Sequence, residues 1–158
     1  MKIAVLTISD SSYRGEREDR SGPAVQARLN ALGFAAAPPE IVPDERTQIA
    51  DRLSELADSG TYAAIFTTGG TGVALRDITP EATRDAIDRE IPGLGEVMRA
   101  EGLKKTPMSP LSRSTAGTRG RVLIVNLPGS PKGAVESLDA IAHLVPHMLK
   151  LLAGDTEH

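Results

Sequence analysis

The sequence predicts an α/β protein with three layers, in which a mostly parallel sheet of about five strands lies between helices on both faces. Short apolar segments typical of covered strands alternate with longer segments whose apolar residues recur at helical spacing. No internal repeat or low-complexity block interrupts this alternation. The 158 residues are therefore expected to form one domain over 1–158, with a tail that frays after about residue 154.

The first half of the chain contains two strand and two helix candidates. Gly33 lies where a helix C-cap is expected. Pro38 and Pro39 remove two ladder donors, so the segment around them suits only an edge strand or a bulge. The expected elements are a strand over 2–8, a helix over 21–32, a weak strand over 34–42 and a helix over 43–60.

The second half continues the alternation. Thr79-Pro80 is a good helix opening, because the hydroxyl can cap free N–H groups and proline suits the first helical position. A Pro/Ser/Thr/Gly-rich connection over 104–120 is long enough to indicate a functional or mobile segment. The expected elements are a strand over 63–66, a helix from Pro80 to Pro92, a helix over 94–102, a strand over 121–127 and one last helix over 135–152.

Composition excludes several classes of function. A net charge of −3 and 3% aromatic residues argue against nucleic-acid binding. The absence of cysteine excludes disulfides and thiolate sites. No apolar run approaches the ~20 residues needed to cross a bilayer, and the first segment turns polar too early for a signal peptide. The sequence therefore favours a cytoplasmic protein without a membrane partner.

A dense glycine cluster, Thr67-Thr68-Gly69-Gly70-Thr71-Gly72, follows one strand candidate and leads through 76–81 into a helix. Glycine is costly in regular structure, so this density indicates a sharp bend or a close approach to a ligand. The simpler alternative is a tight connection with no ligand.

Four polar clusters follow strand candidates, and the carboxyl ends of parallel strands share one edge of a sheet. These clusters are expected to converge on one crevice. GxxxxGK[ST] and GxGxxG are absent, but glycine-rich backbone before a helix presents N–H groups to an anion. A phosphate-bearing ligand is the natural hypothesis. The clusters are Ser9-Asp10, Pro43-Asp44-Glu45, Thr67 to Asp77, and Pro128 to Gly133.

Asp44 and Asp77 each precede a helix. An aspartate there is commonly a cap or a turn brace, stabilising by roughly 1 kcal/mol. Paired carboxylates that face phosphates would instead hold Mg²⁺. Both interpretations stay open on local pattern; Asp10, Asp19 and Asp85 are weaker candidates for a metal.

Charge and histidine patterns add one further hypothesis. Residues 99–121 carry six basic side chains and one acidic one, a patch that would attract an anion if it is not merely a solvated loop. His143 and His147 are four residues apart, but without a third ligand they indicate a surface pair rather than a metal site. A serine hydrolase is disfavoured because GxSxG is missing.

Five motifs in order resemble the MoaB/Mog family of molybdenum-cofactor biosynthesis proteins, whose fold also forms the G domain of gephyrin. The similarity covers nearly the whole chain, including Ile8-Ser9-Asp10 and Asp19 to Pro23. The motifs are VPDE at 42–45, TTGGTG at 67–72, RDITPEAT at 76–83, LSRSTAG at 111–117 and LPGSPKG at 127–133.

The resemblance implies a trimeric molybdopterin adenylyltransferase that uses Mg²⁺ and ATP, and a possible contact with a molybdate-insertion protein. The family's two required aspartates match Asp44 and Asp77, expected at Mg²⁺ and the triphosphate, and its molybdopterin-side serine matches Ser112. These three are the expected catalytic residues. The expected nucleotide-binding residues are Gly69, Gly70, Thr71, Gly72, Pro128, Gly129, Ser130 and Pro131; those expected for molybdopterin are Ser9, Asp10, Ser112, Arg113 and Ser114.

Three alternatives stay open. A paralogue could bind molybdopterin or nucleotide without adenylylation, although both aspartates are present. A non-enzymatic scaffold, as in receptor anchoring by gephyrin, is disfavoured because no linker or second domain is evident in this sequence. A relative of the competence-damage amino-terminal domain would act on a nucleotide, but the LSRSTAG segment favours the pterin.

Overall fold

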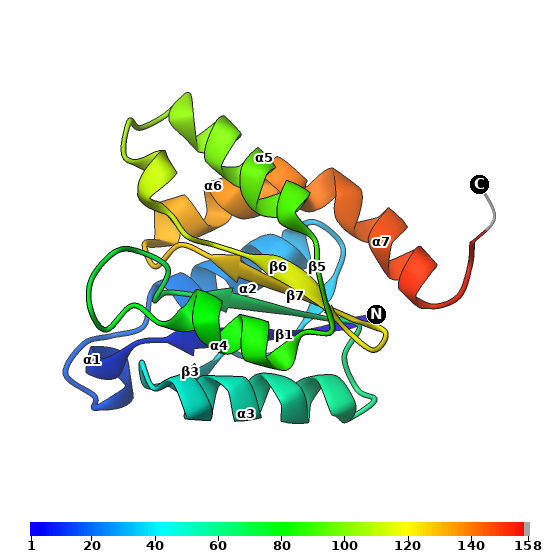
Figure 1. Cartoon of the computed structure of the whole chain (residues 1–158), viewed down its shortest axis with the longest axis horizontal. Coiled ribbons are helices and arrows are strands. Elements are labelled where there is room, and N and C mark those ends of the chain that lie inside the picture. Colours follow the sequence, from blue (N-terminus) through cyan, green and yellow to red (C-terminus); the bar gives the residue numbers. More distant parts are fainter. Residues whose placement is uncertain (157–158) are drawn as a thin grey trace.

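The computed structural model describes residues 1–156, whose strands form one seven-stranded sheet between two layers of helices (Figure 1). The sheet order is β2-β1-β4-β7-β6-β5, and β3 also pairs with β1. The bounds of the strands are β1 Lys2–Ile8, β2 Ala35–Ala36, β3 Glu40–Val42, β4 Ala64–Thr68, β5 Arg89–Glu90, β6 Ala116–Arg119 and β7 Val122–Leu127.

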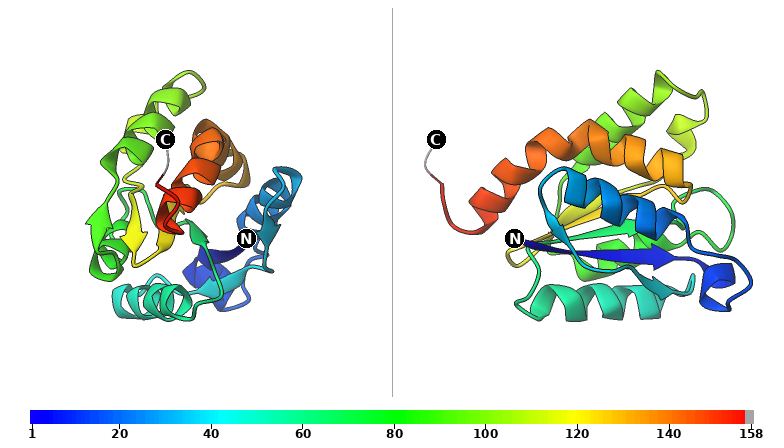
Figure 2. Two further views of the ribbon diagram at one scale, coloured as in Figure 1. Left: turned by 90° about the vertical axis from the view of Figure 1, so that its right-hand side faces the viewer. Right: turned by 180° about the vertical axis from the view of Figure 1, so that it is seen from behind.

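The helices cover both faces of this sheet, as the two views of Figure 2 show. One layer contains α3 and α4, and the opposite layer contains α2, α5, α6 and the start of α7. Their bounds are α1 Asp10–Tyr13, α2 Ser21–Ala31, α3 Arg46–Asp58, α4 Thr79–Ala86, α5 Pro92–Leu103, α6 Pro131–Ile141 and α7 Val145–Leu152, with 3₁₀ turns at Ser109–Leu111 and Ala142–Leu144. No helix within 1–156 is long and apolar enough to cross a membrane.

Strand β1 shows how the sequence builds two cores. Successive strand residues point to opposite faces. Ile3 and Val5 accordingly pack with the α2, α5 and α6 layer, whereas Leu6 and Ile8 pack with the α3 and α4 layer. All of these side chains are buried, which explains the continuous apolar run.

The parallel part of the sheet confirms the predicted α/β class. The sheet has seven strands, more than the expected number of about five. The 34–42 segment divides at Pro38-Pro39 into β2 and β3, both of which pair with β1. Two further strands were not predicted: β5, and β6 inside the supposed connection over 104–120. Both are antiparallel, and β5 has only two residues, too short for a visible alternation.

Two helix predictions were also wrong in detail. The last helix breaks into α6 and α7 at Ala142–Leu144. Pro146 explains the break, because its ring excludes the carbonyl four residues earlier and it has no N–H to donate. Thr79 does not cap α4; the N-cap is Ile78, and Thr79 Oγ1 instead donates to the Gly69 carbonyl at 2.9 Å.

At the C-terminal end, α7 is closed by local backbone hydrogen bonds. The Gly154 N–H donates to Leu151 and the Asp155 N–H donates to Lys150, while Gly154 has a φ of 99°. Glu157 and His158, on which part of the expected frayed tail falls, lie outside the described residues.

Candidate functional site

A cleft of about 840 Å³ lies at the carboxyl ends of β1, β4 and β7. After β1 the chain adds β2 and β3 on one side of it and then β4 on the other, so the strand order reverses here. Such a switch point is where open α/β sheets bind ligands. The predicted convergence of polar clusters is confirmed: the cleft is lined by Ser9, Asp10, Asp44, Gly69, Gly70, Asp77, Gly129, Ser130 and Pro131, among others.

The glycines allow the loops after β1, β4 and β7 to pack backbone against backbone. Gly69 has a φ of 103°, and its N–H donates to the Leu127 carbonyl at 3.1 Å. A Cβ on Gly69 would collide with the Ile8 carbonyl, and one on Gly129 would lie 3.3 Å from Gly69 Cα. Side chains at these positions would separate the loops that form the cleft, so the glycines are required by the packing of the loops; whether the loop also binds a ligand stays a prediction.

Asp10 and Asp44 exchange hydrogen bonds across the cleft wall. The Asp10 N–H donates to Asp44 Oδ2 at 2.9 Å, and the Asp44 N–H donates to Asp10 Oδ1 at 2.9 Å. Arg76 holds Asp10 with two hydrogen bonds of 3.0 Å and Glu45 with a third of 3.0 Å. The loops after β1, β3 and β4 are thus connected by polar contacts at one point.

The pKa values of Asp44 and Asp10 are shifted in opposite directions. Burial, with the nearby negative charges of Asp10 and Asp77, raises the pKa of Asp44 above its ordinary value. The hydrogen-bonded Arg76 guanidinium lowers the pKa of Asp10. Asp44 is therefore a carboxylate whose charge is poorly compensated by the protein, as expected for a group that meets a cation.

Asp77 presents a free carboxylate oxygen. Its Oδ2 accepts the Ala74 N–H at 3.0 Å, while Oδ1 has no hydrogen-bond partner among residues 1–156. Within that range no three acidic or histidine side chains form a cluster that could hold a metal. Asp44 and Asp77 both line the cleft, and two carboxylates could hold a Mg²⁺ ion whose shell is completed by substrate phosphates and water.

A second, smaller cavity of about 210 Å³ lies beside α5, the Ser109–Leu111 turn and the start of α6. Ser112 lines it, together with Met98, Arg99 and Lys105. Ser130, at the N-cap of α6, lines both cavities. The structure therefore places Ser112 in a different cavity from the two aspartates, and Ser130 lines both cavities.

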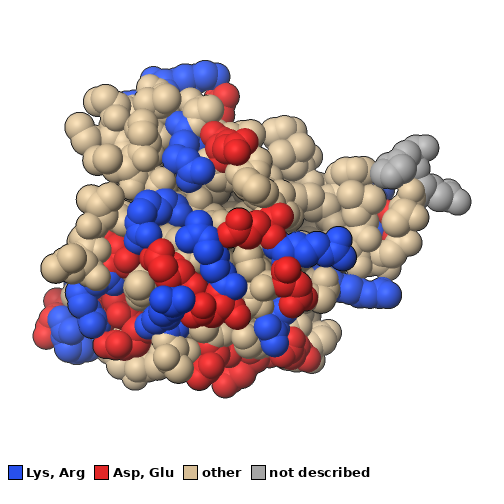
Figure 3. Space-filling view, in the orientation of Figure 1, with Lys and Arg blue, Asp and Glu red and all other residues tan. Residues whose placement is uncertain are grey.

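The basic segment does not form a free cationic patch. Arg119 pairs with Asp58 at 3.0 Å, Lys104 with Glu101 at 2.9 Å and Arg113 with Glu81 at 2.7 Å. Basic and acidic side chains accordingly interleave over the face shown in Figure 3. The expectation of an anion-attracting surface along 99–121 is corrected in part: Lys104, Arg113 and Arg119 pair with carboxylates, whereas Arg99 and Arg121 donate to backbone carbonyls.

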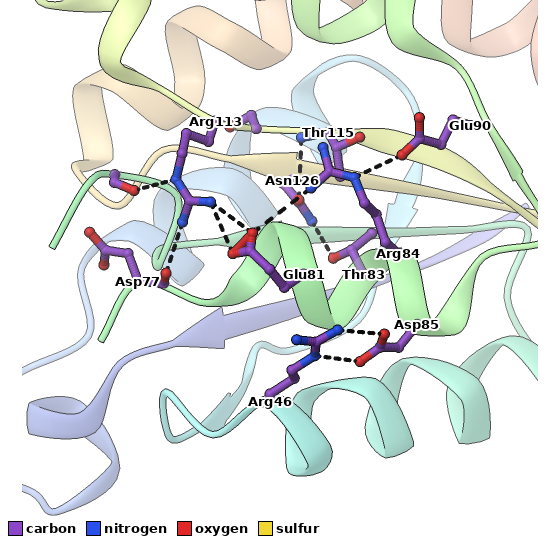
Figure 4. A network of polar contacts seen from close by, with 12 residues as sticks. Arg46, Asp77, Glu81, Thr83, Arg84, Asp85, Glu90, Arg113, Thr115 and Asn126 are labelled. Atoms are coloured by element: carbon purple, nitrogen blue, oxygen red, sulfur yellow. Dashed lines mark hydrogen bonds and ion pairs between the residues drawn. The ribbon is translucent and has the colours of Figure 1, made fainter. Parts of the chain in front are cut away.

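Arg113 faces the glycine loop rather than a cavity (Figure 4). Its guanidinium donates to the carbonyls of Gly72 at 2.7 Å and Asp77 at 2.8 Å and to both Glu81 oxygens. Arg113 lines neither cavity and braces the glycine loop, so its role in holding a pterin phosphate stays a prediction.

Four other predicted residues support the site without lining the large cleft. Thr71 is buried, and its carbonyl accepts the Arg113 N–H at 2.8 Å. Ser114 is buried and its Oγ accepts from Ser112 Oγ at 3.1 Å. Gly72 leaves room for Asp77, since a Cβ there would lie 2.8 Å from Asp77 Oδ2, and Pro128 lines only the smaller cavity.

Sequence reasoning missed most of one wall of the cleft and one buried polar network that lines neither cavity. The segment from Ser11 to Ser21 contributes much of the cleft wall, including Arg14 and Arg17, and it also carries Asp19, which the sequence indicated as a weaker metal candidate. Asn126, buried in β7, donates to Thr67 and Thr83 and accepts from the Thr115 N–H (Figure 4). The Asp19–Pro23 motif was a sequence signal for the cleft wall. For Asn126, a lone asparagine in an apolar strand gave only a weak signal.

The switch-point cleft, its glycine loops and its paired carboxylates define a class: α/β proteins that bind phosphate-bearing ligands at the carboxyl edge of a sheet. A family model described as a probable molybdopterin binding domain matches residues 4–148. The chain belongs to this family, the MoaB/Mog family that its motifs resemble.

Relatives match over nearly the whole chain. A molybdopterin adenylyltransferase from Helicobacter pylori J99 is 44% identical, covering 97% of this chain and 88% of that protein. The corresponding protein from Escherichia coli K12 is 36% identical, covering 98% of this chain and 86% of its own. The crystal structure of the molybdopterin biosynthesis enzyme MoaB from Thermus thermophilus is 52% identical, with a TM-score of 0.90 over 97% of this chain and 96% of that one.

Proposed function

We propose that this protein is a molybdopterin adenylyltransferase that transfers AMP from Mg²⁺-ATP to the terminal phosphate of molybdopterin and releases pyrophosphate. The observation that supports this most directly is the pair of cavities that share Ser130. A transferase must hold two substrates so that their reacting groups meet. The larger cleft, with its carboxylates and glycine loops, suits the nucleotide, and the smaller cavity beside Ser112 suits the pterin. This assignment moves Ser9 and Asp10, expected at molybdopterin, to the nucleotide side.

Within the larger cleft, N–H groups of the glycine loops other than that of Gly69, which donates to Leu127, and the N-terminal end of α6 favour phosphate oxygens. Asp44 and Asp77 would hold Mg²⁺. When bound, the ion supplies positive charge that neutralises the crowded phosphates. The raised pKa of Asp44 in the ligand-free protein agrees with this role, because a cation there removes the burial cost of its charge.

The reaction needs little proton transfer from the protein. A phosphate monoester is largely dianionic at neutral pH because its second pKa is about 6. One of its oxygens forms the new bond to the α-phosphorus of ATP, and the bond from that phosphorus to the bridging oxygen of pyrophosphate breaks. The protein's part is to position the two phosphates in line and to balance charge, which agrees with a site made of aspartates, serines and backbone N–H groups.

The direct test is to incubate the protein with molybdopterin, ATP and Mg²⁺ and to measure adenylylated molybdopterin and pyrophosphate. We expect both products in equal amounts, and neither when ATP or Mg²⁺ is omitted. Nucleotide binding without product, under conditions in which the Escherichia coli relative works, would favour a binding paralogue.

The expected homotrimer, the cytoplasmic location and a contact with a molybdate-insertion protein are part of the same proposal. Their support is the family resemblance. Sedimentation equilibrium tests the first, cell fractionation the second, and co-purification the third.

A further inference from the structure

Arg76 lies at the point where three loops of the cleft meet. Its Nε and Nη2 each donate to one Asp10 oxygen at 3.0 Å, and Nη2 also donates to Glu45 Oε1 at 3.0 Å. Asp10 follows β1, Glu45 follows β3 and Arg76 itself follows β4. A planar guanidinium with several fixed donors is suited to such a three-way contact, which an ammonium could not reproduce.

The contact continues from Asp10 to Asp44. Asp10 Oδ1 accepts from Arg76 and also from the Asp44 N–H, while the Asp10 N–H donates to Asp44 Oδ2. One oxygen of Asp44 is thereby fixed. The other, Oδ1, lies beside Gly70, 3.0 Å from where a Cβ would stand. The carboxylate thus has one oxygen held by the protein and one turned toward the glycine loop.

Arg76 is also the chain neighbour of Asp77. Its attachment to Asp10 and Glu45 therefore restrains the loop that carries Asp77 as well as the loop that carries Asp44. Its stability contribution is small, because the Arg76 side chain is 59% exposed and surface ion pairs add about 0–1 kcal/mol. A contact that connects both carboxylate loops but contributes little stability is better explained by positioning.

We propose that Arg76 is a positioning residue that sets the geometry of Asp44 and Asp77 for the metal–nucleotide complex, acting through Asp10 and Glu45. This inference rests on the proposed function for the identity of that complex. Groups that orient metal-binding side chains typically matter 10- to 100-fold for metal affinity. Arg76 is not assigned a contact with substrate.

The test compares Arg76→Ala with Arg46→Ala in the full chain. Arg46 is a matched control: it is about half exposed and forms a similar forked pair, 2.7 and 2.9 Å to Asp85, but it connects α3 to α4 outside the cleft. Binding of α,β-methylene-ATP is measured by calorimetry over a series of Mg²⁺ concentrations. Thermal unfolding of each variant checks that the fold is retained.

We expect Arg76→Ala to raise the Mg²⁺ concentration for half-maximal nucleotide binding by about tenfold, with full binding restored at saturating Mg²⁺. Arg46→Ala should bind as the unmodified protein does, and Arg76→Lys should lie between. Asp10→Asn, which keeps its N–H to Asp44 but weakens the Arg76 pair, should give a shift of the same sign. In the Asp10→Asn background, Arg76→Ala should add less than it does alone.

Two results would overturn the proposal. One is the same Mg²⁺ dependence for Arg76→Ala and Arg46→Ala. The other is a loss of binding by Arg76→Ala that excess Mg²⁺ does not restore, which would indicate a direct phosphate contact. If the unmodified protein binds the analogue but forms no adenylylated molybdopterin, the proposed function fails, while the comparison of the two variants still decides the role of Arg76.

Discussion

The Arg113 guanidinium donates to both oxygens of the Glu81 carboxylate, with Nη1–Oε distances of 2.9 and 2.7 Å. The same group donates to the carbonyls of Gly72 and Asp77. Arg113 therefore fixes the glycine loop from outside the cleft, and Glu81 carries the negative charge that balances it. Consistently, Arg113 lowers the pKa of Glu81.

Arg113→Ala should lower the free energy of unfolding by about 2 kcal/mol, because each charge-assisted hydrogen bond contributes roughly 1.5–3 kcal/mol and exposure reduces the sum. Denaturant unfolding measures this value. The control is Arg28→Ala, which breaks an exposed pair with Asp139 and should cost no more than about 1 kcal/mol. Equal midpoints for the two variants would show that Arg113 is not a brace.

Gly70→Ala should be strongly destabilising. Gly70 has a φ of 70°, and a Cβ there would collide with Thr79 Oγ1 and approach Asp44 Oδ1. The backbone strain costs roughly 1–2 kcal/mol and the overlap about 1–3 kcal/mol more. Gly33→Ala is the control, since Gly33 has a φ of 94° with open space around it and should show the strain alone. Unfolding free energies that match within error would contradict this account.

The sequence predicted the central fold well because its signals are local. The continuous apolar run of 2–8 and the glycine at 33 mark a buried strand and a helix end, and the structure confirms both. Strands β5 and β6 were missed for a physical reason: their pairing with each other is a long-range property, and Gly117 within β6 reads as a loop residue. Gly117 is needed because a Cβ would collide with the Arg89 carbonyl.

The site could be predicted from the sequence where its residues come directly after the ends of strands. Asp44, Asp77 and the glycines at 69 and 70 come together as expected because parallel strands share an edge. The partners of the cations were not predictable. Arg113 pairs with Glu81, which is 32 residues away in the chain, and Arg76 pairs with Asp10, 66 residues away. A count of charges along 99–121 could not reveal that carboxylates from other elements pair with Arg113 and Arg119.

Asp44→Asn and Asp77→Asn should each lower pyrophosphate release with molybdopterin at least about 100-fold, because each removes one of the two carboxylates proposed to hold the Mg²⁺ that neutralises the phosphates. Asparagine keeps the shape and an acceptor oxygen, so the fold should be retained. Asp85→Asn is the control. Asp85, on α4, pairs with Arg46 (Figure 4), and it does not line the cleft. Full activity in both cleft variants would remove these residues from the catalytic site.

Ser112→Ala should affect only the smaller cavity. It removes a hydroxyl that donates to Ser114 Oγ and accepts the Ser114 N–H. We expect a three- to tenfold loss, the size of one neutral hydrogen bond, in turnover or molybdopterin affinity, with the KM for ATP unchanged. Ser54→Ala on α3, whose hydroxyl bonds only to the Ala50 carbonyl, is the control. If Ser112→Ala changed only the KM for ATP, the assignment of Ser112 to the molybdopterin cavity would be wrong.

The opposite pKa shifts of Asp44 and Asp10 predict opposite effects on stability in the ligand-free protein. The pKa of Asp44 is raised by burial, so its charge destabilises the fold at pH 7, and this cost disappears as the pH falls through the folded pKa to below 3.8. Asp44→Asn should therefore raise the melting temperature at pH 7, with a difference that shrinks in acid.

The pKa of Asp10 is lowered by Arg76, so its charge stabilises the fold above 3.8 and this contribution is lost as the pH falls below that value. Asp10→Asn should lower the melting temperature at pH 7 and have progressively less effect in acid. Melting curves of both variants and the unmodified protein from pH 7 to pH 3 measure the two trends. A lower melting temperature for Asp44→Asn than for the unmodified protein at pH 7 would contradict this account, because it would mean that the charge of Asp44 stabilises the fold.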